Sequence, residues 1–343
     1  MEVRKFLMRV AYKIIYQRHD SAIFERYTFQ KKSYGGKEPE KTYMILRRDD
    51  LNVGVFSDYL VFLGAIEFAV NRGYIPVIDR LNFPLCILQR KEEYYKNNAW
   101  EYFFEQPMGI GLEEVKKDRK NVILSPEYTE GNVYDGIFMN KVYQEDMALR
   151  IYWKRMAHKY IRFNQDTTKE LDAERERLKT QGGGIDFDKE RILGIGMREG
   201  YAVANKNGVG LPHQFTTDEV INHIKKIFNK DHQISKIFLT CEYEETISIF
   251  EKEFTKEKVF YIPKTRYHEG DEYPYDVNRL ADIYDRKDRR AIALNYVKEV
   301  YFLSCCDSII YTMSSGNMAA YLMKPGEYRH VVFCDENGIV HES

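Results

Sequence analysis

The chain has 343 residues, of which 44 % are hydrophobic and 31 % are charged, and its net charge is −1. This length predicts two domains, and a nearly neutral charge excludes a general electrostatic attraction to nucleic acid. No apolar run reaches the roughly eighteen residues that a membrane-spanning helix needs, and we expect no cleavable secretory signal. The five cysteines are odd in number and lie in apolar stretches, so we expect reduced thiols in a cytoplasmic protein.

Residues 1–16 place apolar side chains on one face of a helix and basic side chains mostly on the other. Such a helix can lie on an anionic membrane surface, which would make the protein peripheral on the inner face of the membrane. It can also pack against the body of its own protein, and the sequence leaves both alternatives open.

The first half contains a βαβ unit. Its pattern predicts a strand at 42–46, a helix at 59–72 and a second strand at 74–79, with a glycine-bearing turn before the helix. The turn lacks the G-x-G-x-x-G spacing, so the fingerprint of a nicotinamide or flavin cofactor is absent. Asp50 lies in the loop after the first strand, where we expect it to face a cleft between the domains.

A long charged segment separates the two halves. It predicts one helix from residue 146 to about residue 180, which ends at the glycines 182–184. A helix that stops at a glycine run is the expected domain boundary. We therefore divide the chain into an N-terminal α/β domain, residues 1–185, and a C-terminal Rossmann-like domain, residues 190–343.

The second half alternates strands with helices. The strands are predicted at 191–197, 236–240, 259–262, 308–311 and 331–333. The helix predicted at 220–228 follows threonine and acidic residues that suit an N-terminal cap. This β-loop-α alternation implies a parallel sheet that binds ligands at the carboxyl ends of its strands.

Residues 289–323 have the order helix, strand, small polar turn, helix. A helix at 289–300 precedes the strand at 308–311, the turn at 312–317 reads T-M-S-S-G-N, and a strong helix former follows. Backbone N–H groups at such a helix start suit a phosphate or another anion. An ordinary crossover with a serine N-cap has the same pattern, so both interpretations stand.

Three loops are expected to meet at the carboxyl edge of the second sheet, and they begin at Arg198, Thr240 and Thr312. Arginine is the preferred bidentate partner of a diphosphate, and hydroxyl residues at a helix start add neutral donors. A carboxylate such as Glu242 or Glu299 can accept a hydrogen bond from a nucleobase or a sugar hydroxyl. Together these residues predict a site for a nucleotide diphosphate held without a metal. A salt bridge for Arg198 and a solvated helix start for Glu242 are the alternatives.

Several segments of the second half resemble one enzyme family. F-L-S-C-C-D-S-I-I-Y-T-M-S-S-G at 302–316 resembles the F-L-S-x-A-D-x-x-x-x-T-x-S-S segment of the α1,6-fucosyltransferases and nodulation fucosyltransferases. These belong to a wider group that includes the α1,2- and protein O-fucosyltransferases. G-I-G-M-R-E at 194–199 is similar to that group's H-x-R motif, and F-L-T-C-E-Y at 238–243 resembles its L-A-T-D-D segment. The likeness covers much of the second half and extends loosely to the first.

The resemblance implies a GT-B-like pair of Rossmann-type domains facing each other across a cleft, with the acceptor on the first domain and the nucleotide sugar on the second. It implies an inverting transfer of fucose from GDP-fucose, with no metal and no further cofactor. Arg198 would neutralise the departing GDP, and Glu242 and Glu299 would hold the nucleoside. The other candidate donor contacts lie in the same loops and helix start: His213, Thr240, Thr312, Ser314, Ser315 and Gly316.

Several positions depart from the family pattern, and the family's D-D pair is Cys241-Glu242 here. Gly196 stands where the family has its histidine, Glu199 where it has a second basic residue, and Tyr201 where it has Asp or Asn. These changes leave the catalytic base unassigned, and inversion needs a group that takes the proton of the acceptor hydroxyl. Asp50 is the first candidate for this base and Glu199 is the second.

The sequence thus predicts a glycosyltransferase that moves a sugar, with fucose as the first choice, to a saccharide acceptor in bacterial surface-polysaccharide or glycoconjugate synthesis. The alternative is a non-catalytic protein that binds a nucleotide sugar or a glycan through a decayed transferase site. Release of free GDP from the donor separates the two, because only an enzyme turns the donor over.

Overall fold

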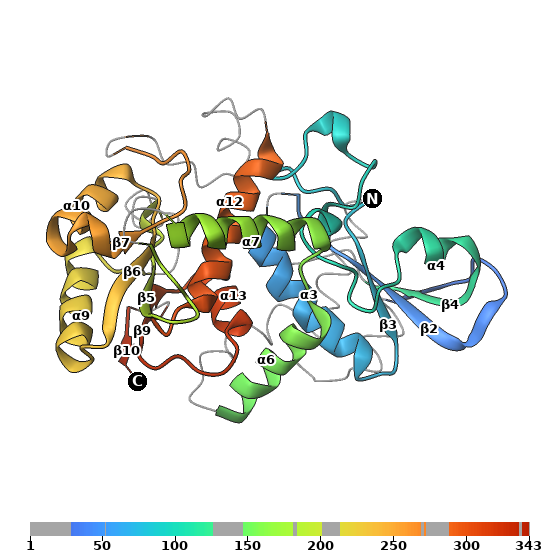
Figure 1. Ribbon diagram of the computed structural model, residues 1–343. Helices are drawn as coiled ribbons and strands as arrows, with labels where there is room; N and C mark the ends of the chain where they lie inside the picture. The colour runs from blue at the N-terminus through green and yellow to red at the C-terminus, as the bar shows by residue number, and fades with distance from the viewer. Residues whose placement is uncertain are drawn as a thin grey trace. The chain divides into compact units, whose positions relative to one another are not determined.

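The computed structural model describes residues 29–51, 53–125, 147–180, 184–200, 213–268, 271, 288–335 and 338–342. The helix expected at residues 1–16 lies outside the described residues, as does Tyr201. The chain separates into two compact units, Met1–Asn164 and Gln165–Ser343, each with its own sheet (Figure 1). The expected α/β class with two mostly parallel sheets is therefore confirmed.

The first unit is built on a four-stranded sheet with the order β1-β4-β2-β3. β2 pairs in parallel with β3 and β4, and β1 is antiparallel to β4. The strands are β1 Gln30–Lys32, β2 Lys37–Arg47, β3 Ile75–Asp79 and β4 Arg119–Leu124. Residues 43–47 of β2 are all buried, as expected for a central strand of a parallel sheet.

The helices of the first unit are α3 Val55–Val70, α4 Leu112–Asp118, α6 Met147–Tyr160 and the 3-10 helices η1 Lys91–Glu93 and η2 Ala99–Tyr102. α3 joins β2 to β3 and is buried along most of its length because its sequence is almost entirely apolar. α4 packs Leu112 and Val115 into a core cluster with Tyr43, Ile45 and Val77. The βαβ unit predicted from the sequence is thus present.

The second unit is built on a six-stranded sheet with the order β10-β9-β8-β5-β6-β7. Of the strand pairs that the structure describes there, β9–β10 is antiparallel and the others are parallel. Its strands are β5 Arg191–Gly196, β6 Ile234–Thr240, β7 Val259–Phe260, β8 Ser308–Thr312, β9 Val331–Cys334 and β10 Val340–Glu342. The chain runs outward from β5 to β7, then returns to the other side of β5 for β8 and β9. The side on which successive strands are added to the sheet therefore reverses between β5 and β8, and we call this place the reversal point. In open α/β sheets, ligands bind at the carboxyl ends of the strands at such a point.

The helices of the second unit are α7 Gln165–Thr180, α9 Thr217–Lys230, α10 Glu244–Phe254, α12 Arg289–Cys305, α13 Ser315–Met323 and the 3-10 helix η3 Lys256–Lys258. α9 and α10 share a core cluster with Leu193 and Ile195 of β5. Successive side chains on a strand point to opposite faces. Accordingly, a Cβ at Gly194 would meet Leu303 and Cys306, at the end of α12. The sheet is thus covered by α9 and α10 on one face and by α12 and α13 on the other.

The single helix expected over residues 146–180 is in fact two helices, α6 and α7, separated by residues 161–164. The Arg162 carbonyl accepts a hydrogen bond from the Glu105 N–H at 2.9 Å, and the Asn164 N–H donates to the Phe103 carbonyl at 3.0 Å. These contacts within the first unit replace the hydrogen bonds that would continue the helix.

The compact units divide at the same break, between Asn164 and Gln165. The sequence analysis predicted the boundary at residues 185–190 and thus assigned residues 165–180 to the first domain. In the structure these residues form α7, which belongs to the second compact unit. A further difference is that α12 continues to Cys305 instead of ending at residue 300. It continues because the buried side chains of Val300, Phe302 and Leu303 extend its apolar side.

Candidate functional site

The carboxyl ends of β5, β6 and β8 lie next to one another. Gly196, the last residue of β5, pairs with Tyr311 of β8 on one side and with Thr240 of β6 on the other. Arg198 follows β5 and Ser314 follows β8, so the loops that carry them leave neighbouring strands at the reversal point of the sheet. The structure therefore brings together the three loops that the sequence singled out.

Arg198 is held by a carboxylate and lies near an aromatic ring. Its Nη1 lies 2.7 Å from Glu242 Oε1, and the other oxygen of that carboxylate accepts a hydrogen bond from the Gly200 N–H at 2.8 Å. Its guanidinium carbon lies 5.6 Å from the ring centroid of Tyr296, a residue of α12. The Glu242 side chain is 8 % exposed, whereas that of Arg198 is 24 % exposed. The carboxylate thus fixes the guanidinium, which still reaches the surface.

The start of α13 has the features of an anion site. Ser314 is its N-cap, Ser315 and Gly316 form its first residues, and its first turn contains no acidic residue. A Cβ at Gly316 would collide with the hydroxyl of Tyr296, so that hydroxyl lies against the backbone of the helix start. Tyr296 therefore approaches both the Arg198 guanidinium and the N-terminus of α13. A positive side chain and a helix N-terminus, both suited to an anion, are combined at one place.

Glu199 connects the loop after β5 to the loop after β6 and the start of α10. Its Oε2 accepts hydrogen bonds from the backbone N–H groups of Glu242 and Tyr243 at 2.7 and 3.2 Å, and its Oε1 accepts one from the Thr246 hydroxyl. Burial raises the pKa of Glu199, although these hydrogen bonds act to lower it. Because both carboxylate oxygens bind the start of α10, the geometry suits positioning of the Arg198 loop better than proton transfer.

Glu299 lies on the same face of α12 as Tyr296, and its side chain is 2 % exposed. Its Oε2 lies 2.7 Å from Lys264 Nζ, and its Oε1 lies 3.8 Å from Arg266 Nη2. Among the described residues, this buried Oε1 has no hydrogen-bond partner. Lys264 and Arg266 belong to the loop after β7. The carboxylate expected to hold a nucleoside is thus buried beside two cations, and one of its oxygens can still accept a hydrogen bond.

The remaining expected donor contacts have structural partners. Thr240 Oγ1 donates to a carbonyl of β5 at 3.2 Å, and Thr312 Oγ1 donates to Gln214 Oε1. Both threonines are buried and support the ends of their strands. His213 is exposed, and a Cβ at Gly338 would come within 3.3 Å of its ring, which places His213 beside the turn between β9 and β10.

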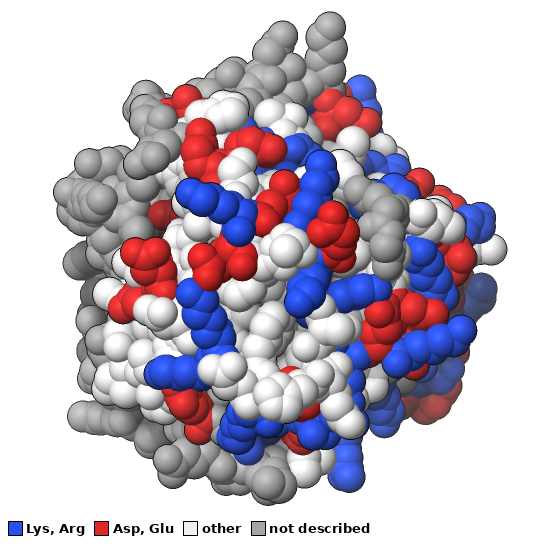
Figure 2. Space-filling model, turned by 60° about the vertical axis from the view of Figure 1, so that its left-hand side comes forward, with Lys and Arg blue, Asp and Glu red and all other residues white. Residues whose placement is uncertain are grey.

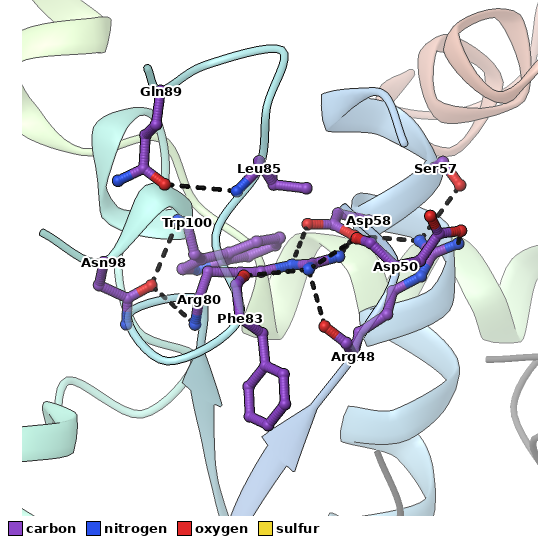
Figure 3. Close-up of polar contacts among 10 residues, drawn as sticks. All are labelled: Arg48, Asp50, Ser57, Asp58, Arg80, Phe83, Leu85, Gln89, Asn98 and Trp100. Carbon is purple, nitrogen blue, oxygen red and sulfur yellow. Dashed lines mark hydrogen bonds and ion pairs between the residues drawn. The ribbon is translucent and has the colours of Figure 1, made fainter. Parts of the chain in front are cut away.

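Asp50 belongs to the first unit, where it follows β2 (Figure 3). The side chain of Arg80 is fully buried, and its Nη1 donates to the Asp50 carbonyl at 3.1 Å. Its Nε, at 2.7 Å, and its Nη2 donate to the Asp58 carboxylate. Arg48 Nη1 also donates to Asp58, at 3.0 Å, and Arg48 Nη2 lies 3.9 Å from Asp50 Oδ2. The Asp50 side chain is 37 % exposed. A buried network thus anchors the loop while the Asp50 carboxylate reaches the surface.

Tyr296, Lys264 and Arg266 were not among the residues expected from the sequence. Tyr296 could have been found because it lies three residues before Glu299 on one predicted helix, and residues at that spacing share a face. Lys264 and Arg266 lie two and four residues after the predicted strand at 259–262, at the end where ligands bind.

In the parts of the chain that the structure describes, no group of three or more His, Cys, Asp or Glu side chains could hold a metal ion. The helices described are also too short or too polar to cross a membrane. Figure 2 shows basic and acidic side chains interspersed over one face of the molecule, in agreement with the net charge near zero.

Comparison with known proteins identifies the fold. No protein-family model and no curated protein sequence matches the chain. The NodZ α-1,6-fucosyltransferase co-crystallised with GDP matches with a TM-score of 0.53 and 15 % identity, over 88 % of this chain and 98 % of that chain. A NodZ structure soaked with GDP-fucose gives 0.53 at 14 % identity, and NodZ from Bradyrhizobium gives 0.51 at 14 %, each over 88 % of this chain and 99 % of that chain. The chain therefore has the fold of the NodZ fucosyltransferases, which confirms the expected GT-B-like fold class.

Proposed function

We propose that this protein is a glycosyltransferase that takes a sugar from a GDP-sugar, with fucose as the sugar and a saccharide as the acceptor. One observation carries the proposal: Arg198 and the N-terminus of α13 meet at Tyr296, at the reversal point of the second sheet. A guanidinium and a helix N-terminus both suit paired phosphates. The fold likeness supports the choice of donor, because the matching NodZ structures were obtained with GDP and with GDP-fucose.

In this proposal the donor binds along the carboxyl edge of the second sheet. Negative charge grows on the diphosphate as the bond to the sugar breaks, and Arg198 stabilises that charge without a metal. The backbone N–H groups at the start of α13 and the Tyr296 hydroxyl add neutral donors. Glu299 offers an acceptor and Lys264 a donor side by side, a pair that matches the N1–H and O6 of guanine. Glu242 then positions Arg198 rather than binding the nucleoside itself.

The acceptor is assigned to the first unit and the donor to the second. In an inverting reaction the acceptor hydroxyl attacks the sugar from the side opposite GDP and loses its proton to a base. We assign that role to Asp50, because its carboxylate is 37 % exposed on a loop that Arg80 anchors. The proposed setting is bacterial surface-polysaccharide or glycoconjugate synthesis in the cytoplasm, with peripheral membrane contact through residues 1–16.

The first test is the effect of Arg198→Ala on GDP affinity, measured by calorimetry. Loss of a charge-assisted contact should weaken binding by about 2 kcal/mol, or roughly thirtyfold. Arg329→Ala is the matched control, because Arg329 also pairs with a buried acid, Asp231, but precedes β9 at the opposite edge of the sheet. Equal GDP affinity in the Arg198 variant and the wild type would remove the basis of the proposal.

The second test compares two carboxylates. Asp50→Asn should lower kcat by about a hundredfold or more while leaving GDP affinity and unfolding unchanged. Glu199→Gln should instead lower the free energy of unfolding by about 1–3 kcal/mol, because the carboxylate accepts buried hydrogen bonds. The reverse pattern would move the base from Asp50 to Glu199.

A second candidate function is a non-catalytic protein that binds a nucleotide sugar or a glycan. It is favoured by Glu199, which stands beside the candidate phosphate-binding arginine and whose carboxylate is engaged on both oxygens. Incubation with GDP-fucose distinguishes the candidates: an enzyme releases GDP over many turnovers, by transfer or by slow hydrolysis, and a binding protein does not.

A further inference from the structure

Asn317, the third residue of α13, ties together the ends of two strands. Its side chain is buried, and its Nδ2 donates to the Gly196 carbonyl at 3.0 Å and to the Thr312 carbonyl at 2.9 Å. Gly196 is the last residue of β5 and Thr312 the last of β8. One amide group therefore bridges the two strands at the point where the sheet reverses its order.

The Asn317 side chain fills the space that a side chain at residue 196 would need. A Cβ on Gly196 would lie 2.8 Å from Asn317 Cγ and 3.0 Å from its Nδ2, and closer still to its Oδ1. The amide is buried and bonded to two carbonyls, so it cannot turn away without breaking both hydrogen bonds. Glycine at residue 196 is thus required by this close approach rather than by its own backbone conformation.

We propose that Asn317 is a positioning residue of the donor site, which sets the distance between the end of β5 and the start of α13. This inference rests on the proposed function. Arg198 follows Gly196 closely, and the helix-start N–H groups follow Thr312 closely. A diphosphate gains from both groups only if they are held at a fixed separation, since misplacement of one binding group loses the benefit of simultaneous contact.

The contact between Gly196 and Asn317 explains why this chain has a glycine where the fucosyltransferase pattern has a histidine. A side chain at residue 196 and the Asn317 amide exclude each other. The glycine at the family's histidine position therefore has a structural reason in this chain, and it is not by itself a sign of a decayed site.

The test is a double-mutant cycle of Gly196→Ala and Asn317→Ala, with GDP affinity measured by calorimetry at a temperature where circular dichroism shows each variant folded. Each single variant should bind GDP at least tenfold more weakly, about 1.4 kcal/mol. The double variant should bind within twofold of Asn317→Ala, because the added methyl group then fits the vacated space. Asn98→Ala is the matched control: Asn98 also donates from a buried amide to a strand carbonyl, Ile78 at 2.8 Å, but in the first unit. It should lower the melting temperature and leave GDP affinity unchanged.

Losses of affinity that simply multiply in the double variant, or an unchanged affinity in Asn317→Ala, would overturn the inference. Failure of the wild type to bind GDP would defeat the proposed function instead. Urea unfolding of the wild type, the two single variants and the double variant tests the Asn317 bridge between β5 and β8 in the same way. Equal urea midpoints for Asn317→Ala and the double variant support the inference, and additive shifts of the midpoint overturn it.

Discussion

Replacement of Tyr296 by phenylalanine tests whether its hydroxyl belongs to the donor site. The hydroxyl lies against Gly316 at the start of α13, and the ring lies 5.6 Å from the Arg198 guanidinium carbon. Tyr296→Phe keeps the ring and removes only the hydroxyl. A hydrogen bond to a charged group contributes about 1.5–3 kcal/mol, so we expect GDP affinity to fall roughly ten- to a hundredfold.

Tyr296→Leu removes the ring as well. A cation–π contact at a partly exposed site contributes about 0.5–1 kcal/mol, so the leucine variant should bind GDP a further two- to fivefold more weakly. Calorimetric titration with GDP measures both steps. Tyr152→Phe is the control, because the Tyr152 hydroxyl donates to Glu67 at 2.8 Å in the first unit and should not affect GDP.

Wild-type affinity in Tyr296→Phe would mean that the hydroxyl only packs against α13. A leucine variant that binds as well as the phenylalanine variant would show that the ring does not orient Arg198. Either result refutes part of the site as described.

Two further predictions concern buried charges. Lys264→Met leaves the Glu299 carboxylate, 2 % exposed, without the ammonium group 2.7 Å away, and should lower the free energy of unfolding in urea by about 3 kcal/mol or more. Lys225→Met, which breaks an exposed ion pair, should cost less than about 1 kcal/mol, and an equal loss in the two variants would contradict the burial argument. Burial acts to raise the pKa of Asp231, but hydrogen bonds, including one from Arg329, hold it below its usual value. Such a carboxylate contributes its full stability above the unfolded pKa of about 4 and loses it as the pH falls through the lower folded pKa. Asp231→Asn should therefore be less stable than the wild type at pH 7, with a difference that shrinks below about pH 4; a difference that does not change with pH would contradict this.

Local signals in the sequence predicted much of the second unit. Its strands are short apolar runs bounded by polar loops, and their parallel arrangement follows from the helices between them. The turn T-M-S-S-G-N predicted a capped helix start, and Ser314 is the N-cap of α13. Thr216 and Glu219 likewise form the expected capping box of α9. In each case the residues that decide the structure lie within one turn of one another.

Contacts between residues that are far apart in the sequence could not be predicted from local sequence patterns. Gly196 and Asn317 are 121 residues apart, and nothing local to either residue indicates that one fills the space beside the other. The break between α6 and α7 contains no glycine or proline. It is set by tertiary contacts, including Phe163 stacked on Phe104 with ring centroids 5.3 Å apart.

Glu199 shows the same limit for chemistry. In the sequence it is a carboxylate beside a candidate phosphate-binding arginine, which makes it a candidate base. In the structure its oxygens accept hydrogen bonds from Glu242, Tyr243 and Thr246. Whether a carboxylate is available for proton transfer depends on these partners, which come from the loop after β6 and from α10.

A crystal structure of the protein with GDP tests the central claim most directly. We expect the phosphates within about 2.7–3.2 Å of the Arg198 guanidinium and of the backbone N–H groups of residues 315 and 316, with the guanine edge at Glu299. GDP bound away from the β5–β8 reversal point, or bound with its phosphates in contact with neither Arg198 nor the start of α13, would contradict the proposed donor site.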